Sequence, residues 1–156
     1  MKENLNSTAS DYQLAENAAL RLIARSEQCA AGLSRKLEKR KFDAAVVSEV
    51  ISKLTELKLL DDDRFARLWL ESRLRLTRSP RQMLSSLYAK GIDRGSAQAA
   101  LKNILDEETE LSMIKRFVKK NSRKPGKSED FKRDVKYMLK NEGFSYQVIE
   151  RYLEEE

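Results

Sequence analysis

The sequence predicts an all-α fold of three tandem three-helix repeats that form an elongated, curved, solenoid-like rod. One apolar triplet, with gaps of four and five residues, occurs three times along the chain: Leu33-Leu37-Phe42, Met83-Leu87-Ile92 and Val135-Leu139-Phe144. A residue type that commonly begins a helix follows each triplet directly: Asp43, Asp93 and Ser145. A period of about 50 residues is typical of stacked supersecondary units, and not of one domain folded around a catalytic cleft.

The composition agrees with a helical chain. Of the 156 residues, 36% are charged, and only five are Gly and two are Pro, so few residues interrupt helices. Aromatic residues make up 7% of the chain, so each unit has a thin core of small aliphatic side chains. Such units need their neighbours, or a partner, for stability.

The first repeat is predicted over residues 12–60, after a polar tail at residues 1–11. Its first helix is expected over about 12–26, because apolar residues there recur at helical spacing. A second helix carries the first triplet. A third begins at Asp43, whose carboxylate is expected to accept a hydrogen bond from a free backbone N–H at the helix start.

The second repeat is predicted over residues 61–105. It opens with three consecutive aspartates, which oppose the positive end of a helix dipole. The start of its second helix is the clearest local signal in the chain: Ser79 caps, Pro80 takes the first helical position and Gln82 completes a capping box. Gly91 is expected to end this helix, because glycine tolerates positive φ.

The third repeat is predicted over residues 106–156. A loop at 121–127, marked by Pro-Gly, separates its first helix from a second at about 128–142. Gly143 is expected to end that second helix as Gly91 ends its counterpart. The third helix begins at Ser145.

Basic residues gather in one cluster per repeat. The net charge is +6 and the sequence pI is about 9.4. Residues 115–140 hold eleven basic residues against three acids, and residues 64–81 hold six arginines against Glu71. This distribution favours a discontinuous positive surface that follows phosphates or an acidic protein, although helices also place Lys and Arg on any solvated face. The candidate partner and DNA contacts are Arg35, Lys36, Arg73, Arg75, Arg78, Arg81, Lys115, Arg116, Lys119, Lys120, Arg123, Lys132, Arg133 and Lys136.

Residues suited to catalysis are scarce. The chain has no histidine, which removes the commonest general base, and its single cysteine, Cys29, is too little for a zinc site. The three aspartates at 61–63 could in principle hold Mg²⁺, but acids at a helix start are more simply a cap and a dipole partner. We therefore expect no enzymatic activity, no cofactor and no metal.

The sequence predicts a cytoplasmic monomer without membrane contact. No apolar run approaches the roughly 20 residues of a membrane span, and the polar N-terminus lacks the apolar segment of a signal peptide. A single cysteine rules out an internal disulfide and fits a reducing compartment.

Several spaced motifs resemble those of the RecX regulatory family. The segment Leu60-Asp61-Asp62-Asp63-Arg64-Phe65 resembles the motif that opens the second repeat of that family, and Leu87-x-x-Lys90-Gly91-Ile92 resembles the end of its next helix. The segment 33–37 resembles the first-repeat motif, and the likeness covers about residues 12–156. We interpret the motif residues as mainly structural: Asp61, Asp62, Arg64, Phe65 and Gly91.

The resemblance implies a cytosolic bacterial modulator of the RecA recombinase. It implies binding to RecA and to its filament on single-stranded DNA, suppression of ATP hydrolysis and strand exchange, and a position in the helical groove of the filament. DNA contact through the basic clusters would be weak or dependent on RecA. Two alternatives stay open, a stand-alone helical DNA-binding module that acts through phosphate contacts and a protein scaffold without DNA contact.

The chain departs from the family pattern at the start of the second helix of two repeats. In the first repeat, Cys29 and Gly32 stand where relatives usually have serine and glutamate, a loss of a cap and of a helix former that costs about 1–2 kcal/mol. In the second, Ser79 stands where glycine is common and makes a better cap. The first repeat is therefore expected to be the softest and to become ordered on binding.

Overall fold

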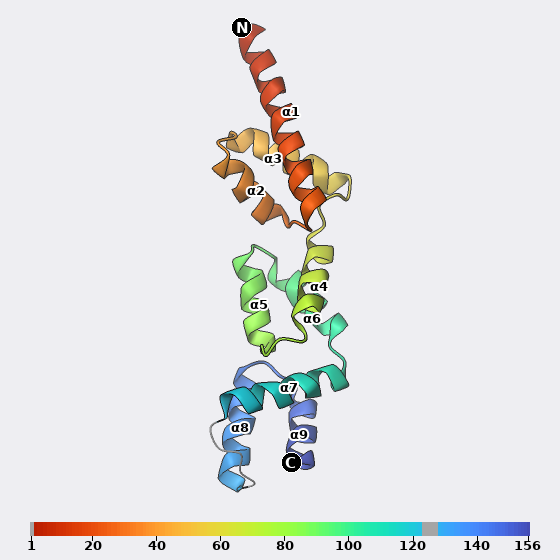
Figure 1. Cartoon of the computed structure of the whole chain (residues 1–156), viewed down its shortest axis with the longest axis vertical. Coiled ribbons are helices and arrows are strands. Elements are labelled where there is room, and N and C mark those ends of the chain that lie inside the picture. Colours follow the sequence, from red (N-terminus) through yellow and green to blue (C-terminus); the bar gives the residue numbers. More distant parts are fainter. Residues whose placement is uncertain (1, 123–127) are drawn as a thin grey trace.

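The computed structural model describes residues 2–122 and 128–156. Over these ranges the chain forms only α-helices: α1 (Lys2–Arg25), α2 (Ala30–Lys39), α3 (Ala44–Glu56), α4 (Asp62–Arg73), α5 (Pro80–Ala89), α6 (Arg94–Ile104), α7 (Glu107–Asn121), α8 (Glu129–Asn141) and α9 (Tyr146–Glu155). They form unit 1 (α1–α3), unit 2 (α4–α6) and unit 3 (α7–α9), which follow one another along an elongated molecule with its termini at opposite ends (Figure 1). The predicted all-α helical repeat is confirmed.

Each unit is built in the same way. The first helix packs on the third, and the second helix packs on the third as well. The repeated triplet explains this arrangement, because its first two residues lie one helical turn apart on the second helix and face the core. In unit 1, Leu33 and Leu37 are fully buried, and in unit 2 Met83 and Leu87 take the same places.

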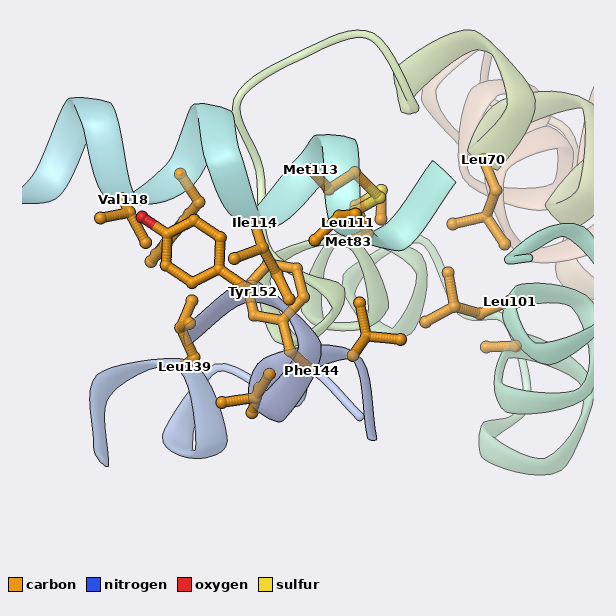
Figure 2. Close-up of a cluster of buried hydrophobic side chains, with 14 of the residues drawn as sticks. Leu70, Met83, Leu101, Leu111, Met113, Ile114, Val118, Leu139, Phe144 and Tyr152 are labelled. Atoms are coloured by element: carbon orange, nitrogen blue, oxygen red, sulfur yellow. The ribbon is translucent and has the colours of Figure 1, made fainter. Parts of the chain in front are cut away.

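Buried side chains form two separate clusters. Unit 1 has its own core, from Ala15 in α1 through Leu37 and Val50 to Leu60. Units 2 and 3 share one continuous core, in which Leu70 and Leu101 of unit 2 join Ile114 and Leu139 of unit 3 (Figure 2). Cys29 is the buried residue of unit 1 that belongs to this second cluster. Units 2 and 3 are thus held together by apolar packing, whereas unit 1 has little apolar contact with them.

Most of the predicted helix ends are found in the structure. The capping box of Ser79 and Gln82 is present, and Asp61 and Asp93 accept hydrogen bonds from the backbone N–H three residues on. Gly91 and Gly143 have φ values of 88° and 85°. Both therefore follow their helices in the left-handed conformation that glycine tolerates.

Two details of the prediction were wrong. Helix α1 begins at Lys2, so residues 2–11, predicted as a polar tail, are helical. Asp43 occupies the N-cap position of α3, but its side chain makes no cap hydrogen bond. Ser145 is the N-cap residue of α9, as predicted, and its hydroxyl donates to Glu110 at 2.9 Å.

The predicted loop at 121–127 lies largely outside the described residues. Helix α7 ends at Asn121, and Ser128 caps α8 by accepting a hydrogen bond from the Phe131 N–H. None of the helices in the described ranges is long and apolar enough to cross a membrane.

Candidate nucleic-acid and partner interface

The second helices of the three units lie end to end. Figure 1 shows α2, α5 and α8 stacked along one side of the molecule, with the start of each helix above the end of the next. At the contact between α8 and α5, the Arg81 N–H donates to the carbonyl of Glu142 at 3.0 Å. A free N–H at the start of one helix therefore meets a free carbonyl at the end of another, and one unpaired group of each helix end gains a partner.

Glycine stands where a helix end touches the next unit. An added Cβ on Gly91 would lie 2.5 Å from Cβ of Ala31, and one on Gly143 would lie 3.6 Å from the Arg81 nitrogen. Lys41 holds the equivalent place in unit 1 and has φ 69°, but no further unit stacks on it. A side chain is tolerated there because only the backbone strain, and no steric contact, opposes it.

The junction between units 2 and 3 joins polar and apolar contacts. The Ser79 hydroxyl, fully buried, donates to Oε2 of Glu142 at 2.5 Å. The guanidinium of Arg116 in α7 donates to the carbonyl of Leu74 at 2.7 Å. Together with the shared core, these bonds fix unit 3 against unit 2.

The junction between units 1 and 2 is mainly polar. The Ala30 N–H, which has no partner within α2, donates to Oδ1 of Asp62 at 2.9 Å. The guanidinium of Arg64 donates to Glu27 at 2.6 Å. The Cys29 thiol lies 3.5 Å from the Lys90 carbonyl, the position that corresponds to Glu142 in the other junction.

The residues of the family motif take part in these structural contacts. Asp61 caps α4, and Arg64 adds bonds to the carbonyls of Lys58 and Leu59 at 3.2 and 3.3 Å. Phe65 packs against the larger core while partly exposed. Each contact agrees with the interpretation of the motif as mainly structural, and Asp62 has a role between units that sequence did not suggest.

A groove opens beside each junction. The upper groove, at the junction of units 1 and 2, has a volume of about 540 Å³. Its wall includes five cationic side chains, two aromatic rings and one carboxylate, namely Arg35, Lys36, Lys39, Arg73, Lys90, Phe65, Trp69 and Glu27. The carboxylate is the one that pairs with Arg64, which lies outside the wall. The upper groove is therefore strongly cationic.

The lower groove, at the junction of units 2 and 3, has a volume of about 630 Å³. Helix α5 and helix α7 line it in the way that α2 and α4 line the upper groove. Its charged side chains are Arg78, Arg81, Lys120 and Glu142, among serine, threonine and amide groups. The two grooves are thus related by the repeat, and both carry an excess of positive charge.

The predicted basic contacts differ in the partners that the structure gives them. Some are neutralised by carboxylates, as in the pairs Lys115–Glu155, Arg133–Asp130 and Lys136–Glu150. Arg35, Arg116 and Lys132 donate to backbone carbonyls, Arg35 to that of Lys90 at 3.2 Å. Within the described part of the chain, no ion pair is formed by Arg35, Lys36, Arg73, Arg75, Arg78, Arg81, Lys119 or Lys120. Arg123 lies outside the described residues.

The pKa shifts follow the same division. The hydrogen bond to Glu150 raises the pKa of Lys136, and the same bond lowers the pKa of Glu150. Likewise, the hydrogen bond from Lys115 is the main cause of the lowered pKa of Glu155. In both pairs the charged forms stabilise each other, so these cations are less available to an external anion than those of the grooves.

The grooves bring together residues that sequence reasoning had kept apart. Lys39 and Lys90 were absent from the predicted contacts. Trp69 packs against the core and also lines the upper groove, with the Arg73 guanidinium 5.1 Å above its ring. The repeat itself carried the missing signal, since Lys90 occupies the position at the helix end that approaches the preceding unit.

Two family models match the chain. The model described as the first three-helix domain of RecX matches residues 15–54, and that of the second three-helix domain matches residues 61–101. The Regulatory protein RecX of Treponema pallidum (strain Nichols) is 39% identical over 111 residues, which cover 70% of this chain and 68% of that protein. The Regulatory protein RecX of Caldanaerobacter subterraneus subsp. tengcongensis is 27% identical over 139 residues, 89% of this chain and 68% of that protein.

Solved structures share the fold. The crystal structure of RecX from Lactobacillus salivarius matches with a TM-score of 0.75 and 24% identity, over 94% of this chain and 97% of that chain. A second crystal structure, of regulatory protein RecX, matches with a TM-score of 0.77 and 22% identity, over 96% of this chain and 76% of that chain. At these identities the likeness concerns the fold alone.

Proposed function

The chain belongs to the RecX family, and from this we propose that it is a non-enzymatic regulator of the RecA recombinase in DNA repair and recombination. It binds the RecA filament on single-stranded DNA in the cytoplasm, as a monomer, and inhibits RecA ATP hydrolysis and strand exchange. Family membership carries the proposal. The cationic grooves support it, because a filament of protein and DNA offers phosphates and acidic side chains along its length.

The repeated architecture suits a periodic partner. Two related grooves lie one repeat apart along a rod, so a single chain can reach neighbouring sites on a filament. Weak contacts that are linked in this way act at a high effective concentration, and together they bind more tightly than any one of them alone. We therefore expect tight binding to the filament and weak binding to its separate components.

The experiment is a titration of RecA ATPase activity on single-stranded DNA with this protein, well below one copy per RecA. Suppression at such ratios is the expected result, because one rod bound in the filament affects several RecA subunits. An unchanged rate, with DNA binding by the protein intact, would favour a stand-alone DNA-binding module instead. An unchanged rate without DNA binding would favour a protein scaffold.

A matched pair of double variants tests the basic surface. Arg75→Ala with Arg81→Ala removes two exposed cations that form no ion pair in the described part of the chain, and should weaken suppression. Lys102→Ala with Arg133→Ala removes the same charge, but Arg133 is already paired with Asp130. This control should suppress the ATPase like the unmodified protein. If both variants lost suppression equally, the effect would depend on net charge and not on these two positions.

A further inference from the structure

The cations of the upper groove have no carboxylate to neutralise them. None of its five cationic side chains forms an ion pair within the described part of the chain, and its one carboxylate, Glu27, pairs with Arg64. Like charges held together around a groove repel each other, and a bound polyanion relieves that repulsion. The groove therefore fits an anionic ligand better than it fits water alone.

The groove also contains aromatic surface, which distinguishes it from the lower groove. Trp69 and Phe65 are both partly exposed there, and Arg73 lies over the Trp69 ring. The aromatic residue of the lower groove, Phe117, is only 5% exposed and is used by the core. Phosphates need cations, but a flat ring and a guanidinium plane also offer a stacking surface to an unpaired base.

We propose that the upper groove binds a short stretch of single-stranded DNA. Lys39, Lys90 and Arg35 contact its phosphates, and an unpaired base stacks against the Arg73–Trp69 pair. The volume of about 540 Å³ lies within the roughly 300–1,000 Å³ of small-ligand sites, enough for a nucleotide. The inference rests on the proposed function only for the setting in which the protein meets a single strand.

Binding at this place would also link two parts of the molecule. Lys39 and Arg35 belong to unit 1, whereas Lys90, Arg73 and Trp69 belong to unit 2. The two units have separate cores and a polar junction. A strand held by both sides of the groove would therefore fix unit 1 against the rest of the chain.

Trp69 is the single tryptophan of the chain, so tryptophan emission, excited selectively over the five tyrosines, reports on this groove. The test uses the full protein without RecA and titrates it with three probes: an oligothymidylate of about 10–15 nucleotides, an abasic oligonucleotide of the same length, and polyglutamate. We expect the oligothymidylate to quench the emission and to bind about tenfold more tightly than the abasic strand, because only the former has bases to stack.

Two variants locate the phosphate contacts. In Lys39→Ala with Lys90→Ala, the slope of log affinity against log salt concentration should become shallower by about 1.4, roughly 0.7 for each lost phosphate contact to a single strand. The control, Lys102→Ala with Lys140→Ala, removes the same charge outside both grooves and should leave the slope unchanged. Neither lysine pair contributes a buried side chain, so all four substitutions should leave the fold intact.

Each other outcome would overturn the inference. Binding of the oligothymidylate without a change in Trp69 emission would place DNA elsewhere on the protein. Polyglutamate that quenches and competes as well as DNA would identify the groove as a site for acidic protein segments. No binding of DNA to the protein alone would reject the groove as a DNA site and would leave the RecA ATPase result untouched. The two proposals can therefore fail separately.

Discussion

The Ser79 hydroxyl donates a hydrogen bond to Oε2 of Glu142 at 2.5 Å and so connects the start of α5 with the end of α8. The same hydroxyl oxygen accepts from the Gln82 N–H at 3.2 Å, as the cap of its own helix. One side chain thus pairs a free N–H at the start of α5 and also joins units 2 and 3. A substitution here affects both at once.

Ser79→Ala should lower the free energy of unfolding by about 1–2 kcal/mol, since it removes a cap and leaves Glu142 without its donor. Ser79→Asp should be at least as harmful, although aspartate is an excellent cap elsewhere, because it brings a second carboxylate to Glu142. Ser128→Asp is the matched control, at an exposed cap whose hydroxyl makes no bond to a carboxylate in the described part of the chain. Urea unfolding measures all three. If Ser79→Asp left the free energy of unfolding unchanged, the bridging role of Ser79 would be contradicted.

Cys29 holds the corresponding place in the other junction, with a weaker set of bonds. Its side chain makes no cap hydrogen bond, and its thiol lies 3.5 Å from the Lys90 carbonyl. Cys29→Ser should raise the free energy of unfolding by about 1 kcal/mol, because the hydroxyl can cap α2 as Ser79 caps α5. Denaturant unfolding would measure the change. A lower free energy of unfolding would mean that packing of the sulfur in the core stabilises the protein more than a serine cap does.

Gly91→Ala and Gly143→Ala separate backbone strain from steric contact. Both glycines have positive φ, so alanine costs about 1–2 kcal/mol at either place. Only at Gly91 would the new methyl group also meet Ala31 at 2.5 Å, whereas at Gly143 the nearest atoms lie at an ordinary 3.6 Å. Gly91→Ala should therefore destabilise more and displace unit 1 from unit 2. Equal losses of stability in thermal unfolding would show that units 1 and 2 can move apart at little cost to make room for the methyl group.

How far sequence could predict this molecule depends on the range of each interaction. The triplets and the Ser79–Gln82 capping box are local, so they predicted the helices and their ends. The bond between Ala30 and Asp62, and the one between Ser145 and Glu110, join residues more than 30 positions apart. No local pattern announces such pairs. The sequence placed the start of α9 at Ser145, but it could not predict the bonds of Ser145 to the distant carboxylate of Glu110.

The candidate interface shows the same limit. Sequence identified the basic clusters, but it could not tell that Lys136 is neutralised by Glu150 while Arg81 is not. Nor could it place Trp69 beside Lys39 and Lys90, which come from two units. Counting charges along a chain gives their density, whereas the stacking of units decides which of them share a groove.

Asp106→Asn should make stability less sensitive to acid. The hydrogen bond from the Thr109 N–H lowers the pKa of Asp106 in the folded state below its ordinary value of 3.8. A carboxyl with a lowered folded pKa stabilises the protein above its unfolded pKa, and this contribution is lost as pH falls through the folded pKa. Asparagine keeps the cap but does not titrate. The fall in melting temperature between about pH 6 and pH 3 should be smaller in the variant, and an unchanged fall would assign the acid sensitivity to other carboxyls.

The two separate cores predict two steps of unfolding. Leu54 is 1% exposed in the core of unit 1, and Leu139 is fully buried in the core shared by units 2 and 3. Either change to alanine removes about 2–5 kcal/mol of packing from its own cluster. Because the clusters touch mainly through Cys29 and polar bonds, Leu54→Ala should speed hydrogen exchange in α1–α3 and leave α4–α9 protected. Leu139→Ala should do the reverse, and it should act on α4–α6 as strongly as on α7–α9. Uniform loss of protection in both variants would show that the polar junction between units 1 and 2 is strong enough to make the whole rod one cooperative unit.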